Sequence, residues 1–176
     1  MFVCLWHILS GGSPRAIVRF RWQTTNFMPE LPEVETTCRG VRPHLVGRRI
    51  TSFVIREARL RVPVPPELKR LLPGRTILDV GRRAKYLLLK MMPSGIVVLH
   101  LGMSGHLRVV AASHPPSRHD HLDIVIDDGN CLRLTDPRRF SCCLWYPDTT
   151  SLKTITGTLG PEPFDSDLTA SYLYTL

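Results

Sequence analysis

The sequence contains no long apolar run and no paired-cysteine motif, and each absence excludes a class of protein. No stretch reaches the roughly 20 apolar residues of a membrane-spanning helix, so we expect no membrane partner. The five cysteines form no Cys-x-x-Cys motif and are odd in number, which argues against a disulfide framework and a zinc ribbon. A reduced, cytoplasmic setting is the best match to this cysteine usage.

Lysine and acidic residues are scarce relative to arginine. Lys and Arg together number 23 against 15 Asp and Glu, which gives a net charge of +8 and an isoelectric point near 9.7. This balance favours a polyanionic partner, with nucleic acid ahead of an anionic membrane surface. Only four of the 23 are lysines, and arginine suits bidentate contacts with phosphate. The alternative is a soluble protein that is merely basic.

The first 27 residues contain no Asp or Glu and precede a second methionine, Met28. We interpret residues 1–27 as an extension that is disordered or belongs to a mis-assigned start, with an organellar transit peptide as the alternative. If Pro29 is the first residue, its nitrogen is a secondary amine with a pKa of roughly 8. Such an amine can form a Schiff base, and Glu30 can shuttle protons. If residues precede Pro29, its nitrogen is an unreactive amide. The alternative to this catalytic role is that the segment only begins a helix, with acidic residues such as Glu33 placed at the positive N-terminal end of the helix.

The spacing of apolar residues predicts one helix followed by many short strands. An apolar face recurs at helical spacing from Pro32 to Gly47, and Pro43 is expected to kink or end this helix. The expected fold is mainly β with an N-terminal helix (α+β), as an antiparallel β-sandwich or flattened barrel. Regularity fades from Asp148, and a possible helix starts at Leu168. The candidate strands are Ile50–Arg56, Thr76–Val80, Tyr86–Met91, Ile96–Leu101, Leu107–Val110, Leu122–Ile126, Cys131–Thr135 and Cys142–Trp145.

Two segments carry side chains that suit a nucleic-acid site. Residues 82–85 read Arg-Arg-Ala-Lys, which is either a solvated basic turn or a phosphate clamp from which Lys85 enters an active site. The segment His100–Gly105 places Met103 between two glycines. That methionine either folds back into the core or forms an apolar wedge that enters a base stack.

Two later segments combine histidine, arginine and an aromatic residue. Arg138 and Phe140 share a face if extended, which suits opened nucleic acid, and the alternative is a salt-bridged strand edge with a core Phe. His119 and His121 share a strand face if extended and could ligate a metal. No third ligand is suitably spaced, so we expect no metal site.

In their order along the chain, these segments resemble the N-terminal domain of bacterial formamidopyrimidine-DNA glycosylase, the enzyme that removes 8-oxoguanine and ring-opened purines from DNA. The opening sequence Glu30-Leu-Pro-Glu33 is more similar to this branch than to the sister endonuclease VIII branch, which typically has Gly at the position of Leu31. The resemblance extends from Met28 to about Leu173. The motifs that carry it are Met28–Glu35, Arg82–Leu89, His100–Gly105, His119–His121, Thr135–Phe140 and Leu159–Pro163.

The resemblance implies a DNA glycosylase and AP lyase that acts on damaged double-stranded DNA in base excision repair. The damaged nucleotide is flipped out of the duplex, the Pro29 amine attacks C1′ and displaces the base, and Glu30 supplies the proton that helps to open the sugar. Elimination from the Schiff base then cuts the strand. Lys85 matches the family's active-site lysine near the lesion and its phosphate, and Glu33 is a supporting residue.

The resemblance also implies how DNA is held. Met103, Arg138 and Phe140 match the trio that fills the gap left by the flipped base. His119, Arg138 and Arg139 are expected to contact DNA. A monomer located in the bacterial cytoplasm with the nucleoid is expected.

Two departures from the family pattern bear on activity. Residues 1–27 block Pro29 unless they are removed, and the chain ends at Leu176, before the family's helix–two-turns–helix module and four-cysteine zinc finger. We therefore expect no cofactor in this chain and weaker DNA binding through lost phosphate contacts. Residues 28–164 are assigned to the catalytic sandwich domain and residues 165–176 to the start of a linker. The alternative function is a truncated, catalytically inactive fragment with weak or no DNA binding.

Overall fold

The computed structural model of the protein describes residues 29–175, and the interpretation of residues 1–27 lies outside this range. Strands dominate the described part of the chain, as the alternation of apolar residues predicts. In chain order the elements are α1 (Leu31–Leu45), β1 (Ile50–Ile55), α2 (Leu68–Leu71), β2 (Thr76–Arg83), β3 (Tyr86–Met92), β4 (Ile96–His100), β5 (His106–Ala111), β6 (Asp120–Ile126), β7 (Asn130–Thr135), β8 (Cys142–Tyr146), α3 (Thr149–Thr156) and α4 (Ala170–Tyr174).

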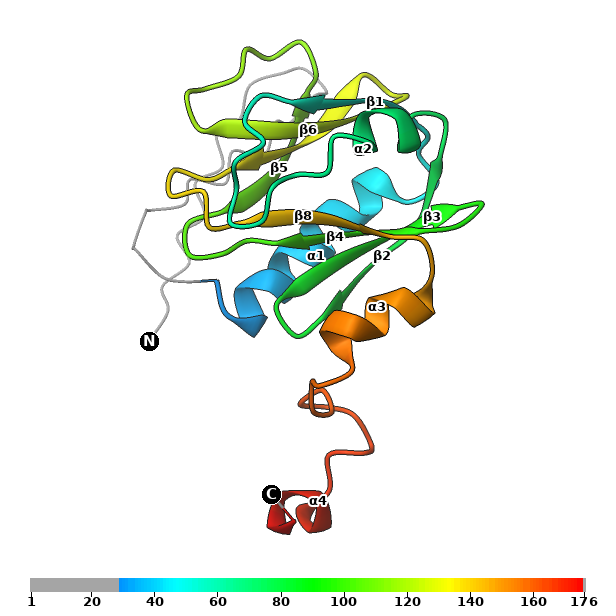
Figure 1. Cartoon of the computed structure of the whole chain (residues 1–176), viewed down its shortest axis with the longest axis vertical. Coiled ribbons are helices and arrows are strands. Elements are labelled where there is room, and N and C mark those ends of the chain that lie inside the picture. The colour runs from blue at the N-terminus through cyan, green and yellow to red at the C-terminus, as the bar shows by residue number, and fades with distance from the viewer. Residues whose placement is uncertain (1–28, 176) are drawn as a thin grey trace, which may run out of the picture.

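The strands form two antiparallel sheets of four strands each. One sheet has the order β1-β6-β7-β5 and the other β2-β3-β4-β8, and Figure 1 shows them as two layers. The predicted antiparallel β-sandwich with an N-terminal helix is confirmed. No strand pairing closes residues 29–175 into a barrel, although a bridge between Arg49 and Thr76 links the starts of β1 and β2.

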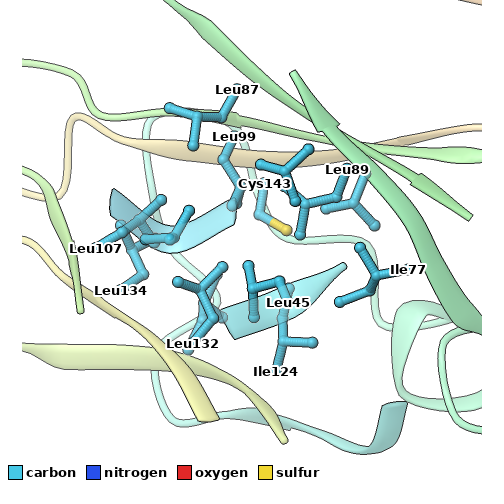
Figure 2. Packing of buried hydrophobic residues seen from close by; sticks show 14 of the residues in the cluster. Leu45, Ile77, Leu87, Leu89, Leu99, Leu107, Ile124, Leu132, Leu134 and Cys143 are labelled. Carbon is cyan, nitrogen blue, oxygen red and sulfur yellow. The ribbon is translucent and has the colours of Figure 1, made fainter. Parts of the chain in front are cut away.

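Aliphatic side chains from both sheets fill the space between the layers. Leu45 of α1, Ile77 of β2, Leu89 of β3 and Leu132 of β7 are almost completely buried, and Figure 2 shows them converging with Cys143 of β8. Burial of each side chain of this size stabilises the fold by about 1.5–3 kcal/mol. This shared core therefore fixes the two sheets against each other and gives the surface loops a rigid base.

The helix α1 bridges the two layers, because it contacts β2 of one sheet and β5 of the other. Pro43 does not end this helix, contrary to one of the two outcomes expected, because it lies in the last turn, where it removes few backbone hydrogen bonds. Gly47 has a φ of +81°, a left-handed conformation typical of a helix stop. The buried face consists of Val34, Cys38, Val41 and Leu45, as the helical spacing predicts.

The helix α3 is not predicted by the sequence pattern, because it is rich in threonine, which has low helix propensity. Its first turn is capped by Asp148, whose carboxylate accepts a hydrogen bond from the Ser151 backbone at 2.7 Å. Leu152 is buried in a small apolar cluster with Leu88 and Val98 of the second sheet. Tertiary packing and the cap thus stabilise a helix that local propensity disfavours.

The helix α4 lies away from the two sheets in Figure 1. It begins at Ala170, close to the expected helix start at Leu168, and Phe164 ahead of it is fully exposed. Within residues 29–175, no helix is both long enough and apolar enough to cross a membrane.

Candidate functional site

The N-terminal end of α1 meets the turn between β2 and β3. The Lys85 ammonium lies 2.5 Å from a carboxylate oxygen of Glu30, the residue that follows half-buried Pro29. Glu33 accepts a hydrogen bond from the Glu30 backbone N–H at 3.1 Å, which is the helix-entry role expected of it. The structure thus brings Glu30 and Lys85 together beside Pro29.

Carboxylates from two distant segments anchor the turn between β2 and β3. Arg82 Nε donates to Glu35 of α1 at 2.7 Å. Glu162 accepts from the Arg83 guanidinium at 2.9 Å and from the Ala84 backbone N–H at 2.7 Å. These contacts hold Ala84 at a φ of +49°, a conformation that costs a non-glycine residue free energy. The two arginines are therefore not free to clamp phosphate, because carboxylates already occupy them, and only 13% of the Arg82 side chain and 26% of the Arg83 side chain remain exposed.

Both anchoring carboxylates favour the ionised form. The hydrogen bond from Arg82 lowers the pKa of Glu35, and Arg39 adds to this effect. Burial raises the pKa of Glu162, but hydrogen bonds from Ala84 and the two arginines outweigh burial and leave its pKa lowered. The turn that carries Lys85 therefore keeps its anchors at neutral pH.

A second group of predicted residues lies on two loops that touch. Met103 and Phe140 expose 37% and 41% of their surface, so neither is a core residue. Gly102, next to Met103, has a φ of +63°, and a methyl group there would overlap the Phe140 backbone carbonyl. Only glycine allows the two loops to approach this closely. The interpretation of Met103 as a residue folded into the core is wrong.

Arg138 and Phe140 lie together because of a turn, and not because of a strand. Residues 136–141 are not extended in a sheet, and Arg139 between the two has a φ of +60°. The Arg138 guanidinium lies 4.8 Å from the centre of the Phe140 ring, which is a cation–π stack. The predicted shared face is therefore present, but the extended backbone on which the prediction rested is not.

Arg139 points to a different partner. Its guanidinium lies 3.4 Å from a carboxylate oxygen of Glu57, in the loop after β1. Hydrogen bonds from Arg59 to Glu57 lower the pKa of Glu57 to about 2. The glutamate thus remains ionised beside Arg139 and competes with any phosphate for it.

His119 lies at an open hollow of about 460 Å³, which is lined by both basic and acidic side chains. It is half-buried and precedes β6, whereas His121 is buried at an irregularity of the β6–β7 pairing. The His121 ring nitrogen Nε2 donates to the Asp136 carbonyl at 2.7 Å, since a carbonyl can only accept. The regular alternation on which a two-histidine metal site would depend is absent here. No group of three or more potential metal ligands occurs within residues 29–175. The hollow is lined by Arg56, Glu57, Ser117, Arg118, His119, Asp120, His121, Pro137 and Arg139.

His100 connects the two groups of residues, and the sequence offered no role for it. Its ring packs against Tyr86, with 5.1 Å between ring centres, and its Nδ1 accepts from the Gly102 backbone N–H at 3.0 Å. Burial lowers the pKa of His100, and the nearby cations Arg61 and Lys85 lower it further. A neutral His100 thus lies at the base of the Met103 loop and near Lys85.

Comparison with known proteins identifies related sequences. Residues 28–143 match the family described as the formamidopyrimidine-DNA glycosylase N-terminal domain. The formamidopyrimidine-DNA glycosylase of Geotalea uraniireducens is 54% identical over 148 residues, which cover 84% of this chain and 54% of that protein. The protein of the same name from Xanthomonas campestris pv. campestris is 52% identical over 149 residues, which cover 85% of this chain and 55% of that protein.

Solved structures share the fold. The Lactococcus lactis formamidopyrimidine-DNA glycosylase, non-covalently bound to DNA that contains an AP site, matches with a TM-score of 0.76 at 30% identity. The match covers 84% of this chain and 56% of that one. A complex of the same bacterium's enzyme with abasic-site DNA gives the same TM-score. The chain spans about half the length of the curated relatives it matches.

Proposed function

Because this chain belongs to the formamidopyrimidine-DNA glycosylase family, we propose that it acts in base excision repair as a DNA glycosylase and AP lyase on oxidised purines. The observation that carries the proposal is the 2.5 Å approach of Lys85 Nζ to Glu30 at the start of α1. It places a carboxylate and an ammonium beside Pro29, the residue whose amine is the proposed nucleophile. Paired acid and base groups beside an amine suit Schiff-base chemistry.

In the proposed reaction, the Pro29 nitrogen lone pair forms a bond to C1′ of the flipped nucleotide. The glycosidic bond breaks, and the damaged base leaves with the bonding electrons. The Glu30 carboxylate takes up the proton that the Pro29 nitrogen loses and passes it to the sugar ring oxygen as the C1′–O bond breaks, which leaves the Pro29 nitrogen double-bonded to C1′ as a Schiff base. Lys85 holds the Glu30 carboxylate beside Pro29, and once Glu30 is protonated its ammonium is free to pair with the nearby phosphate. Elimination then breaks the strand, and no cofactor is needed for these steps.

We propose that the exposed loop residues open the DNA. Met103 and the stacked Arg138–Phe140 pair enter the gap that the flipped base leaves, which compensates part of the lost stacking. His119, Arg138 and Arg139 contact the sugar–phosphate backbone of the DNA. The excess of arginine over lysine favours such phosphate contacts. The chain acts as a monomer in the bacterial cytoplasm, where its DNA substrate is found.

Borohydride trapping with duplex DNA that contains 8-oxoguanine tests this proposal. A chain that begins at Pro29 is expected to form a covalent adduct, whereas the 176-residue chain is not, because its Pro29 nitrogen is an amide. Pro29→Gly is expected to reduce the adduct strongly, and Glu30→Gln to slow its formation by about 100-fold, within the range for a lost general acid. Absence of any adduct from the Pro29 chain, even at low salt, supports an inactive protein instead.

The intact mass of the natural product is the matching observation in cells. A molecular mass equal to that of a chain beginning at Pro29 supports the role of the Pro29 amine as the nucleophile. A mass that includes residues before Pro29 contradicts that role.

A further inference from the structure

A buried carboxylate lies at the point where the Met103 loop meets the Arg138–Phe140 turn. Asp136 follows directly after β7 and has no exposed surface. Its Oδ1 accepts from the Ser104 hydroxyl at 2.6 Å, and its Oδ2 accepts from the Ser141 backbone N–H at 2.7 Å. One side chain thus binds one loop through a serine hydroxyl and the other through a backbone amide.

A third donor ties the two loops more closely. The Arg138 backbone N–H lies 3.2 Å from Asp136 Oδ1 and 3.3 Å from the Ser104 hydroxyl oxygen. Ser104 therefore donates to the carboxylate and can accept from the facing turn at the same time. Gly102 adds a direct backbone approach to Phe140. The two loops share hydrogen-bonding groups as well as surface.

The backbone of Asp136 is itself held in place. Its N–H donates to the His119 carbonyl at 2.9 Å, and its carbonyl accepts from His121 Nε2 at 2.7 Å. These bonds attach Asp136 to the start of β6, which pairs with β7 in the rigid first sheet. The carboxylate is therefore a fixed point to which both loops are attached.

Burial of this carboxylate demands a reason, since an uncompensated buried charge is costly. No cationic side chain within residues 29–175 forms an ion pair with it; its partners are hydroxyl and amide groups. Burial raises the pKa of Asp136, but the bonds from Ser104, Ser141 and Arg138 outweigh burial and lower it overall. A neutral side chain of similar size would fill the same space without the cost of burying a charge. We therefore attribute the charge to the hydrogen bonds that the carboxylate accepts from the two loops.

We propose that Asp136 is a positioning residue that holds Met103 and the Arg138–Phe140 stack together as one rigid wedge. The proposal rests on the proposed function, in which these three side chains enter the DNA. Asp136 itself touches no DNA in this scheme. It acts through Ser104 and the Ser141 amide, and so it sets the spacing between the two exposed parts of the wedge before DNA is bound.

Hydrogen exchange of the 176-residue chain tests the coupling without DNA. Ser104→Ala removes the hydroxyl that donates to Asp136 and accepts from the Arg138 backbone N–H. It is expected to speed exchange about tenfold at the amides of residues 138–141 in the facing turn, including the Ser141 amide that Asp136 holds. Ser104→Thr keeps the hydroxyl and is expected to restore the slow rate. Thr51→Ala, which removes a hydroxyl of β1 that donates to the Val125 carbonyl of β6, is the matched control. Unchanged exchange of the Ser141 amide in Ser104→Ala overturns the proposal.

The consequence for DNA is measured with 2-aminopurine placed opposite a tetrahydrofuran abasic site. The wild-type chain at saturation is expected to raise the fluorescence by unstacking the base. Ser104→Ala and Asp136→Asn are expected to reduce that rise several-fold, while their affinity for the duplex changes less than about threefold, because the wedge fixes geometry more than charge. Thr51→Ala is expected to match the wild type.

The two measurements separate the possible failures. If the wild-type chain binds the duplex without any fluorescence rise, the proposed function is contradicted, and hydrogen exchange alone decides whether Asp136 couples the loops. If the wild type unstacks the base and Ser104→Ala does so equally, the positioning role is overturned while the proposed function stands.

Discussion

The Lys85 ammonium and the Glu30 carboxylate lie 2.5 Å apart, although one belongs to a β-turn and the other to the entry of a helix. Each is partly exposed, with 37% and 50% of the side-chain surface accessible. The pair is thus open to a substrate and not locked inside the fold. Its geometry depends on the carboxylates Glu35 and Glu162, which anchor the same turn.

Loss of Lys85 is expected to slow the chemistry. In a chain that begins at Pro29, Lys85→Ala should lower the trapping rate on 8-oxoguanine duplex by about 10- to 100-fold, the equivalent of a charge-assisted hydrogen bond. Lys90→Ala is the control, because Lys90 lies on β3 with Asp79 at 3.9 Å. Single-turnover trapping measures both variants, and equal rates would remove Lys85 from the proposed site.

A methyl group at Gly102 is expected to push the two wedge loops apart. Gly102→Ala combines a left-handed φ with overlap on Phe140, whereas Gly47→Ala has a similar φ and open space around it. We expect Gly47→Ala to cost about 1–2 kcal/mol of unfolding free energy, the cost of a Cβ in the left-handed conformation, and Gly102→Ala about 1–3 kcal/mol more. Equilibrium urea unfolding gives both values. Equal losses would mean that the loops do not touch in solution.

Neutralising Glu57 is expected to strengthen DNA binding. Glu57→Gln removes the carboxylate that pairs with Arg139 and Arg59, so that Arg139 is free for phosphate. Affinity for duplex DNA should rise several-fold at low salt, and the slope of log K against log salt should steepen by about one. Glu67→Gln makes the same charge change on the exposed start of α2. A response equal to that of Glu67→Gln would indicate a net-charge effect alone.

The buried ion pairs of Asp123 with Arg56 and Arg133 are expected to determine the pH below which the contribution of Asp123 to the unfolding free energy declines. Burial raises the pKa of Asp123, but Arg56 and Arg133 outweigh it, so the folded pKa lies below the unfolded value. The folded state then binds fewer protons than the unfolded state. This stabilisation is present above the unfolded pKa and is lost as the pH falls through the lowered folded pKa. The contribution of Asp123 to the unfolding free energy should therefore be constant from about pH 7 to 5 and fall below about pH 4. The lowered pKa of His100, in contrast, makes the total decline already as the pH falls through the unfolded histidine value.

Arg133 supplies the matching variant, because its guanidinium is buried and lies 2.8 Å from Asp123. Arg133→Met should cost about 3–5 kcal/mol at neutral pH and move the acid decline to higher pH, since it leaves a buried carboxylate with less compensation. Arg39→Met, which breaks an exposed pair with Glu35, should cost less than about 1 kcal/mol. Urea unfolding across the pH range checks both. A small loss for Arg133→Met would mean that water reaches the cluster.

Much of the fold could be predicted because its signals are local. Side-chain alternation has a period of two in any strand, and turn residues such as Asp127, Asp128 and Gly129 mark strand ends, so all eight strands were located with ends shifted by only a few residues. The helix face from Val34 to Leu45 followed in the same way from a period of 3.6. In contrast, α3 depends on the burial of Leu152 against distant strands, which no local pattern reports.

The candidate site divides in the same way. Residue types and their order were enough to single out Glu30, Lys85, Met103, Arg138 and Phe140 and to indicate a family, because side-chain chemistry is a property of each residue. Only the tertiary structure decided that Arg82 and Arg83 are occupied by Glu35 and Glu162, that Arg139 faces Glu57, and that Asp136 joins two loops. The reason is physical: the free energy of a charge or a hydrogen bond depends on which distant residues meet it and on how much water remains, and strand pairing sets both.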